Sequence, residues 1–177
     1  MPRATRDIDI IIVPTREQLT RLIEQFPEMD YYASLDEAVD ALERESQFNV
    51  IDLATGWKID FIIRRDREFS KLEFSRRSMI PFAGTQLYVA SAEDILIAKL
   101  ECAKQGGSER QIEDAAGIIS SQAEALETSY IERWARELGL EEQLRSARKK
   151  AFEGLLGVQL SRQGRRLYTC LVARGPR

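Results

Sequence analysis

The sequence predicts an α+β protein, because strand and helix patterns alternate through its first half and helical patterns fill most of its second half. Its composition, 44% hydrophobic and 31% charged residues, is typical of a folded globular chain. At 177 residues it is long enough to bury a sizeable core. We therefore expect one main domain in which strands come first and helices follow.

Local signals place the individual elements. Strands are expected over residues 6–13, 31–33, 49–53, 57–63 and 86–89. Helices are expected over residues 15–25, 35–45, 91–106, 108–121, 126–138 and 141–151, with a further helix within 64–79. Thr15 with Gln18, and Ser34 with Glu37, have the spacing of capping boxes at helix starts. The turn at Thr55-Gly56 predicts that the strands on either side of it form a hairpin.

The chain is expected to have three parts. Residues 1–122 form the main domain, residues 123–153 form C-terminal helices, and residues 154–177 form a basic tail without predicted structure. From Gln143 to the C-terminus there are nine Lys or Arg residues and a single acid, Glu153. A basic end can attract nucleic acid, but solvated chain ends are also commonly charged, so both interpretations stay open.

Absent residue types narrow the chemistry. The sequence has no histidine, which excludes Ser-His-Asp and Cys-His mechanisms and histidine-ligated zinc. The two cysteines, Cys102 and Cys170, have no metal-binding or disulfide spacing and are expected to be plain thiols. No apolar run approaches the roughly 20 residues that span a bilayer, so we expect a cytoplasmic protein without membrane contact.

Three acids interrupt strands that are otherwise apolar. Asp7 and Asp9 are two residues apart on the first strand, so their side chains project from the same face. Asp60 lies inside the strand over 57–63. If the two strands are neighbours and Asp60 shares that face, three carboxylates converge and hold one or two Mg²⁺ ions (or Mn²⁺) through oxygen ligands. Such a site suits phosphoryl or nucleotidyl transfer.

Each acid also has a structural explanation. Asp60 can form a salt bridge with Lys58 or Arg64, and Asp7 can be an edge-strand acid paired with Arg6. The joint placement of all three acids favours the metal site over these separate explanations.

Two further charged residues lie on the predicted helices. On a helical wheel Lys99 falls between Ile95 and Ala103, in the middle of the apolar face, where a lysine must snorkel or find an anion. Asp114 lies off the apolar face of its helix and can pair with Arg110 one turn earlier.

Four motifs occur in the order found in one family of enzymes. They are Arg3-Ala4-Thr5-Arg6-Asp7-Ile8-Asp9, Lys58-Ile59-Asp60, the segment 91–100 (SAEDILIAKL) and Arg110-Gln111-Ile112-Glu113-Asp114. Together they resemble the minimal nucleotidyltransferases related to AbiEii-type toxins of bacterial toxin-antitoxin systems, over roughly residues 3 to 120.

The resemblance implies a polymerase-beta-type nucleotidyltransferase fold, a small mixed β-sheet flanked by helices with a helical C-terminal part. It implies that Asp7 and Asp9 bind metal, that Asp60 is a third metal ligand or the catalytic base, and that Asp114 is a downstream acid of the active site. By the same resemblance Lys99 lies near the nucleotide phosphates, and Arg3 and Thr5 belong to the family's RxTxD segment.

One family feature has no counterpart in the sequence. The family places a glycine-rich turn and its preceding helix upstream of the RxTxD segment, where backbone amides would hold the triphosphate. Only Met1 and Pro2 precede Arg3 here. Three explanations stay open: the true start lies upstream, the chain is truncated, or NTP binding is lost. Without that helix we expect part of the sheet face to be exposed.

The leading hypothesis is a Mg²⁺-dependent nucleotidyltransferase that moves a nucleoside monophosphate from an NTP to a hydroxyl of RNA, for example tRNA, or of a protein. It would then be a toxin of a toxin-antitoxin pair. The first alternative is an inactive nucleotidyltransferase-like module that binds a partner, such as a cognate antitoxin. The second is a two-metal nuclease, which needs the acids but no triphosphate site.

Overall fold

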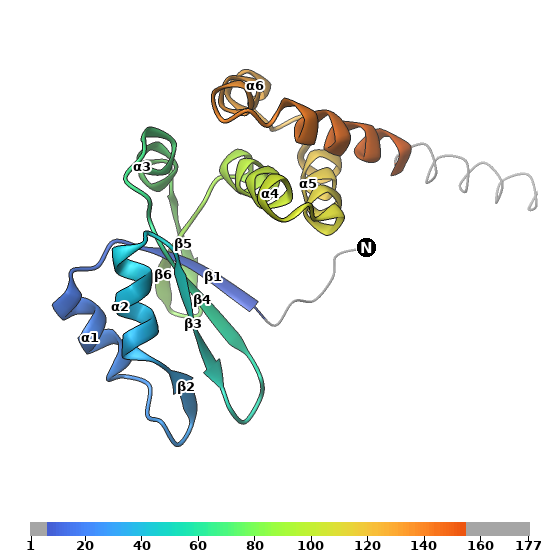
Figure 1. Cartoon of the computed structure of the whole chain (residues 1–177). Helices are drawn as coiled ribbons and strands as arrows, with labels where there is room; N and C mark the ends of the chain where they lie inside the picture. The colour runs from blue at the N-terminus through green and yellow to red at the C-terminus, as the bar shows by residue number, and fades with distance from the viewer. Residues whose placement is uncertain (1–6, 155–177) are drawn as a thin grey trace, which may run out of the picture. The chain divides into compact units, whose positions relative to one another are not determined.

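A computed structural model of the chain describes residues 7–154 and confirms the α+β class (Figure 1). The chain divides into two compact units, Met1–Arg77 and Ser78–Arg177. The first contains a four-stranded mixed sheet with helices, and the second is mainly helical. Each unit is described below by itself.

The first unit is built around a sheet with the strand order β1-β4-β3-β2. Strands β1 and β4 run parallel, whereas β4 with β3 and β3 with β2 are antiparallel. Its elements are β1 (Asp7–Ile12), α1 (Arg16–Ile23), β2 (Tyr31–Ala33), α2 (Leu35–Glu43), β3 (Gln47–Asp52), β4 (Lys58–Ile63) and α3 (Glu68–Ser75). The predicted hairpin over 49–63 is therefore confirmed, and Gly56 in its turn has a φ of 69°.

One face of the sheet carries the core of this unit. Phe48 on β3 and Phe61 on β4 stack with ring centroids 5.2 Å apart. Helices α1 and α2 pack on the same face through Leu19, Ala38 and Ala41, which are 0–1% exposed. The cover is incomplete on the edge strand β1, where the side chains of Ile8 and Ile10 are 48% and 38% exposed.

The two predicted helix caps differ. The capping box of α1 is complete, because the backbone amide of Gln18 donates to Thr15 Oγ1 (3.2 Å) and the backbone amide of Thr15 donates to Gln18 Oε1 (2.8 Å). At α2 the Glu37 amide donates to Ser34 Oγ, but the Glu37 carboxylate accepts the hydroxyl of Tyr32 at 2.6 Å. The Glu37 side chain therefore links β2 to α2.

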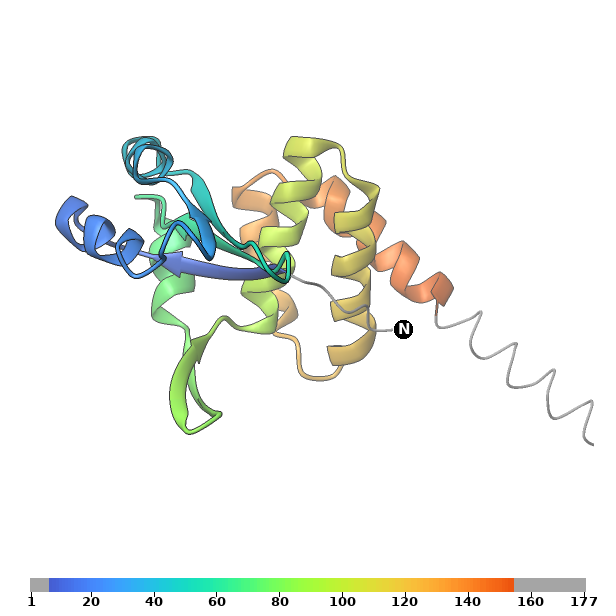
Figure 2. The ribbon, with the colours of Figure 1, turned by 90° about the horizontal axis from the view of Figure 1, so that it is seen from below.

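The second unit begins with a two-stranded hairpin and continues as helices. Its elements are β5 (Ser78–Phe82), β6 (Thr85–Val89), α4 (Ala92–Gly106), α5 (Glu109–Gln122), α6 (Thr128–Glu137) and a helix over 141–154. The sequence predicted β6 but not β5, because the charged segment over 64–79 was expected to contain a helix and no strand was placed between it and residue 86. Pro81 is tolerated here because β5 is an edge strand whose five residues are all exposed. Figure 2 shows this ribbon standing away from the helices of its own unit.

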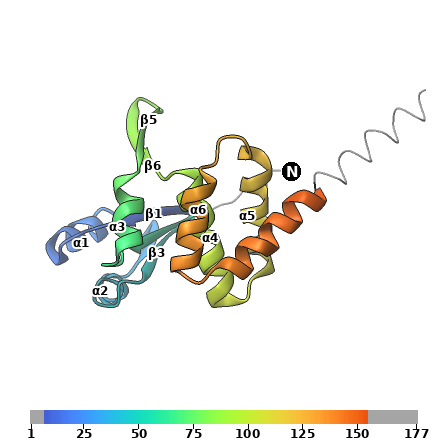
Figure 3. The same cartoon turned by 90° about the horizontal axis from the view of Figure 1, so that it is seen from above.

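Side-chain contacts join the helices of the second unit, which Figure 3 shows from above. Helix α4 packs against α5 and α6. Ser91 is the N-cap of α4. The carboxylate of Asp94, which is fully buried, accepts the hydroxyl of Tyr130 on α6 at 2.6 Å. Near the other end of α4, Lys104 Nζ donates to the carbonyls of Leu138 and Gly139 and so caps α6. Ser108 is the N-cap of α5, but its side chain makes no capping hydrogen bond.

The division after Arg77 differs from the expected boundary after residue 122. Helices α4 and α5 bury Leu96, Leu100 and Ile112 in a helical core together with α6, so they group with the C-terminal helices. The expected tail over 154–177 lies almost wholly outside the described residues. Among the helices of residues 7–154, none is long and apolar enough to cross a bilayer.

Candidate functional site

The register of β1 and β4 brings the sequence-predicted acids of the first unit together. Asp9 is the register partner of Asp60, and Asp7 is the partner of Lys58. Neighbouring strands lie about 4.8 Å apart and side chains two apart share a face, so all four side chains lie on the sheet face opposite the core. We call this group of Asp7, Asp9, Lys58 and Asp60 the acidic cluster.

Asp60 is the buried member of the acidic cluster. The residue is 8% exposed, whereas Asp7 and Asp9 are exposed. Its Oδ2 lies 2.9 Å from Lys58 Nζ, while its buried Oδ1 has no hydrogen-bond partner among residues 7–154. A buried carboxylate oxygen without a partner opposes folding, because it loses its hydration and gains nothing in return. An atom of this kind calls for an explanation, such as a catalytic role or a bound water or ion.

Lys58 provides the positive charge of the acidic cluster. Its hydrogen bond to Asp60 and the negative charges of Asp60, Asp7 and Asp9 raise the pKa of its ammonium, against the opposing effect of burial. The ammonium therefore stays protonated at neutral pH. Of the two salt bridges considered for Asp60, the structure forms the one with Lys58, and the Arg64 guanidinium instead lies over the Phe74 ring.

The acidic cluster fits a divalent cation only in part. As it stands, residues 7–154 contain no group of three Asp, Glu, Cys or His side chains arranged to hold a metal ion. However, the unpartnered Oδ1 of Asp60 adjoins Asp9 in the register, and Asn49 flanks Asp60 from β3. These donors are hard oxygens, which Mg²⁺ and Mn²⁺ prefer. A cation with Asp9 and Asp60 as its ligands is therefore compatible with the donor set, and a cation that uses both oxygens of Asp60 requires Lys58 to release Oδ2.

Sequence reasoning missed one member of this environment, Asn49. Lys58 was considered as a salt-bridge partner of Asp60, and the structure forms that salt bridge. The signal was present for Lys58, because it stands two residues before Asp60 and so shares its face, as Asp7 does with Asp9. Asn49 carries no such signal, since its neighbours depend on the register of the hairpin.

The prediction for Lys99 on the helical wheel is wrong. Lys99 lies on α4 in the second unit and is half-buried, but it is not at the centre of the buried face. Ile95 is 39% exposed and Cys102 is also exposed. The buried positions of α4 are Glu93, Asp94, Leu96, Ile97, Leu100 and Ala103. The helical wheel misplaced the face because it relied on Ile95 and Cys102, which are exposed, and left out Ile97 and Leu100, which are buried.

The remaining predicted site residues belong to the second unit or lie outside the described residues. Asp114 is half-buried on α5, next to the buried Ala115. Arg3 and Thr5 lie outside the described residues. The structure thus brings together Asp7, Asp9 and Asp60 and leaves Lys99 and Asp114 on the helices of the other unit.

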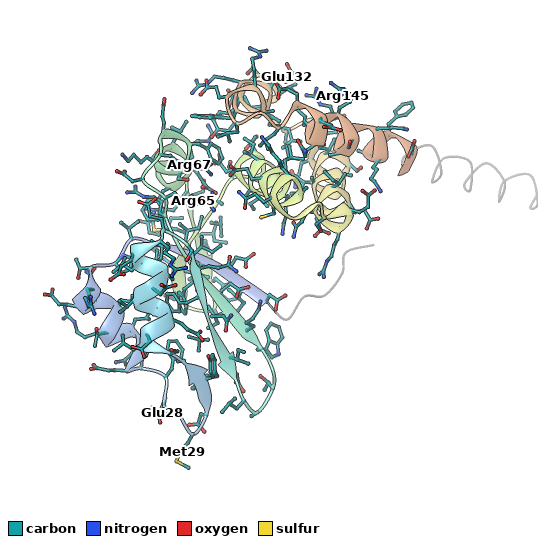
Figure 4. All side chains as sticks on the ribbon, in the orientation of Figure 1. Glu28, Met29, Arg65, Arg67, Glu132 and Arg145 are labelled. Atoms are coloured by element: carbon teal, nitrogen blue, oxygen red, sulfur yellow. The ribbon has the colours of Figure 1, made fainter. Side chains whose placement is uncertain are left out.

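The basic C-terminal region is partly neutralised where the structure describes it. Arg148 pairs with Glu132 at 2.8 Å, Lys149 lies 3.9 Å from Glu153, and Lys150 pairs with Glu109. Arg145 alone among these four basic residues has no ion pair within residues 7–154. Figure 4 shows Arg145 and Glu132 on neighbouring helices, and both line a groove of about 280 Å³. The groove contains acids as well as arginines, so it is not a uniformly basic surface.

Comparisons with known proteins add no assignment: no protein-family model and no curated protein matches the chain.

Proposed function

We propose that the chain is a nucleotidyltransferase of the AbiEii toxin-like class and that the acidic cluster is its metal site. The observation that carries the proposal is the buried Oδ1 of Asp60, which lacks a hydrogen-bond partner within residues 7–154 and adjoins Asp9 across β1 and β4. The mixed sheet flanked by helices, with a helical part after it, is compatible with a polymerase-beta-type fold. The motif resemblance supplies the specific class.

In this proposal the acids of the first unit have separate roles. Asp7 and Asp9 would hold Mg²⁺ or Mn²⁺ from the exposed end, and Asp60 would complete the ligand set from the buried side. When bound, the cation would neutralise phosphate charge during in-line transfer. As the resemblance also allows, Asp60 would instead be the base that accepts the proton of an attacking hydroxyl.

The other site residues are proposed from the resemblance. Lys99 would contact the NTP phosphates, Arg3 and Thr5 would help bind the nucleotide, and Asp114 would be an acid of the active-site region. The acceptor would be a hydroxyl of tRNA or of a protein, and a cognate antitoxin would be the physiological partner of a cytoplasmic toxin.

The test is nucleotide transfer by the purified full-length chain. Protein is incubated with each labelled NTP, Mg²⁺ and a tRNA pool, and both RNA and protein are examined for label. The proposal expects metal-dependent labelling that is lost in Asp7→Ala and Asp60→Ala variants. Asp30→Asn is the matched control, because Asp30 is an exposed acid of the same unit outside the acidic cluster. Labelling that survives in the two alanine variants contradicts the proposal, and degraded RNA would point to a nuclease instead.

The second candidate is an inactive nucleotidyltransferase-like module that binds a partner protein. The salt bridge between Lys58 and Asp60 favours it, because the strongest potential metal ligand already has a protein partner. Titration calorimetry with ATP and Mg²⁺ separates the two candidates. The enzyme requires saturable heat of binding, whereas the inactive module gives none.

A further inference from the structure

We propose that Lys58 is the resident counter-cation of the acidic cluster and that its ammonium competes with a divalent cation for Asp60. The inference rests on the proposed function, because it takes the acidic cluster as a metal site. It adds a residue that controls how readily that site accepts a cation.

The first support is the position of Lys58. It shares β4 and a sheet face with Asp60, and it stands opposite Asp7 in the register of β1. Its Nζ is 2.9 Å from Asp60 Oδ2, close enough for a charge-assisted hydrogen bond. A cation that used both oxygens of Asp60 would occupy the place of this ammonium.

The second support is the balance of charge. Asp9 and Asp60 are directly opposite each other, and like charges in that arrangement destabilise a sheet. The Lys58 ammonium offsets this repulsion in the absence of metal. The ammonium reduces the net negative charge of the acidic cluster, so the cluster attracts an incoming cation less strongly. The ammonium also repels that cation at short range.

The third support is the asymmetry of Asp60. One oxygen is held by Lys58, and the other is buried with no partner among the described residues. A purely structural ion pair would be expected to have the second oxygen hydrogen-bonded as well. The half-satisfied carboxylate is therefore suited to exchange its partner. After release from Asp60, the Lys58 ammonium still faces Asp7.

The test is the affinity of the full-length chain for Mn²⁺, measured by titration calorimetry without nucleotide. Removal of the charge in Lys58→Met is expected to lower the Kd for Mn²⁺ at least roughly tenfold, which corresponds to about 1.4 kcal/mol. Lys58→Gln is a second, more polar variant with the same expected direction, in case the methionine variant does not fold. Lys58→Arg keeps the charge and should bind Mn²⁺ about as weakly as the wild type.

The matched control is Lys71→Met, which removes an exposed lysine of the same unit that pairs with Asp66. Its Kd should equal that of the wild type. If Lys58→Met and Lys58→Gln bind Mn²⁺ no more tightly than the wild type, the role of Lys58 is refuted while the metal site survives. If neither the wild type nor any variant binds Mn²⁺, both the metal site and the role of Lys58 are refuted.

Discussion

Replacing Asp60 by asparagine should separate a metal ligand from a structural ion pair. The substitution keeps the shape of the side chain and removes its charge. Removing one partner of a buried ion pair costs about 3–5 kcal/mol when the other charge is left without compensation. Lys58 is not left in that state, because its side chain is 35% exposed and it faces Asp7.

A second effect acts in the opposite direction. The buried Oδ1 of Asp60 has no hydrogen-bond partner within residues 7–154, and a buried polar group in that state costs roughly 1–3 kcal/mol. A neutral amide is less costly to bury than a carboxylate. Because the two effects oppose each other, we expect Asp60→Asn to change the free energy of unfolding by no more than about 1 kcal/mol. The corresponding change in Tm is at most roughly 4 °C.

The assay is urea denaturation in EDTA, followed by thermal unfolding with and without Mn²⁺. The wild type should gain Tm as Mn²⁺ is added, because the cation binds the folded state. Asp60→Asn should unfold normally in EDTA and gain no Tm from Mn²⁺, whereas the control Asp30→Asn should behave as the wild type. A loss above about 3 kcal/mol in EDTA would refute the reasoning, because Asp60 would then be an essential structural ion pair.

Three further predictions concern stability. Phe61→Ala should lower the free energy of unfolding by about 3–5 kcal/mol in urea titrations, because Phe61 is 5% exposed and stacks on Phe48; a loss below about 1 kcal/mol would contradict this packing. Tyr130→Phe should cost about 1.5–3 kcal/mol in the same assay, because it removes the hydrogen bond to the buried carboxylate of Asp94, and an unchanged midpoint would count against that bond. Hydrogen bonds from the turn that follows β3 lower the pKa of Asp52. The contribution of Asp52 to stability is therefore full above about pH 4 and is lost as the pH falls through the lowered pKa. Asp52→Asn should weaken the dependence of the free energy of unfolding on acid pH, and identical pH profiles for the variant and the wild type would refute this.

Much of the fold follows from short-range signals in the sequence. Thr15 with Gln18 located the start of α1, and the turn at Gly56 located the hairpin of β3 and β4. Strand β5 was missed, because a two-stranded ribbon at the surface tolerates Pro81 and carries little periodic signal. The division after Arg77 was also not expected, since it depends on which helices share a core.

The candidate site was predictable only in part, for a physical reason. Alternation along a strand showed that Asp7 and Asp9 share a face, but the pairing of β1 with β4 is a long-range contact that no local pattern encodes. The competition between Lys58 and a cation likewise depends on the distance to Asp60. Lys99 was misplaced because the apolar residues chosen to define its face included Ile95 and Cys102, which the packing of α4 leaves exposed.

The central claim is that the acidic cluster binds a divalent cation. The most direct measurement is the broadening of backbone amide signals by substoichiometric Mn²⁺ in a two-dimensional NMR spectrum of the full-length chain. The account predicts that signals from Asp7 to Asp9 and from Lys58 to Asp60 broaden first, and that this selectivity disappears in Asp60→Asn. Broadening that is uniform, that is centred elsewhere, or that persists unchanged in the variant would contradict the claim.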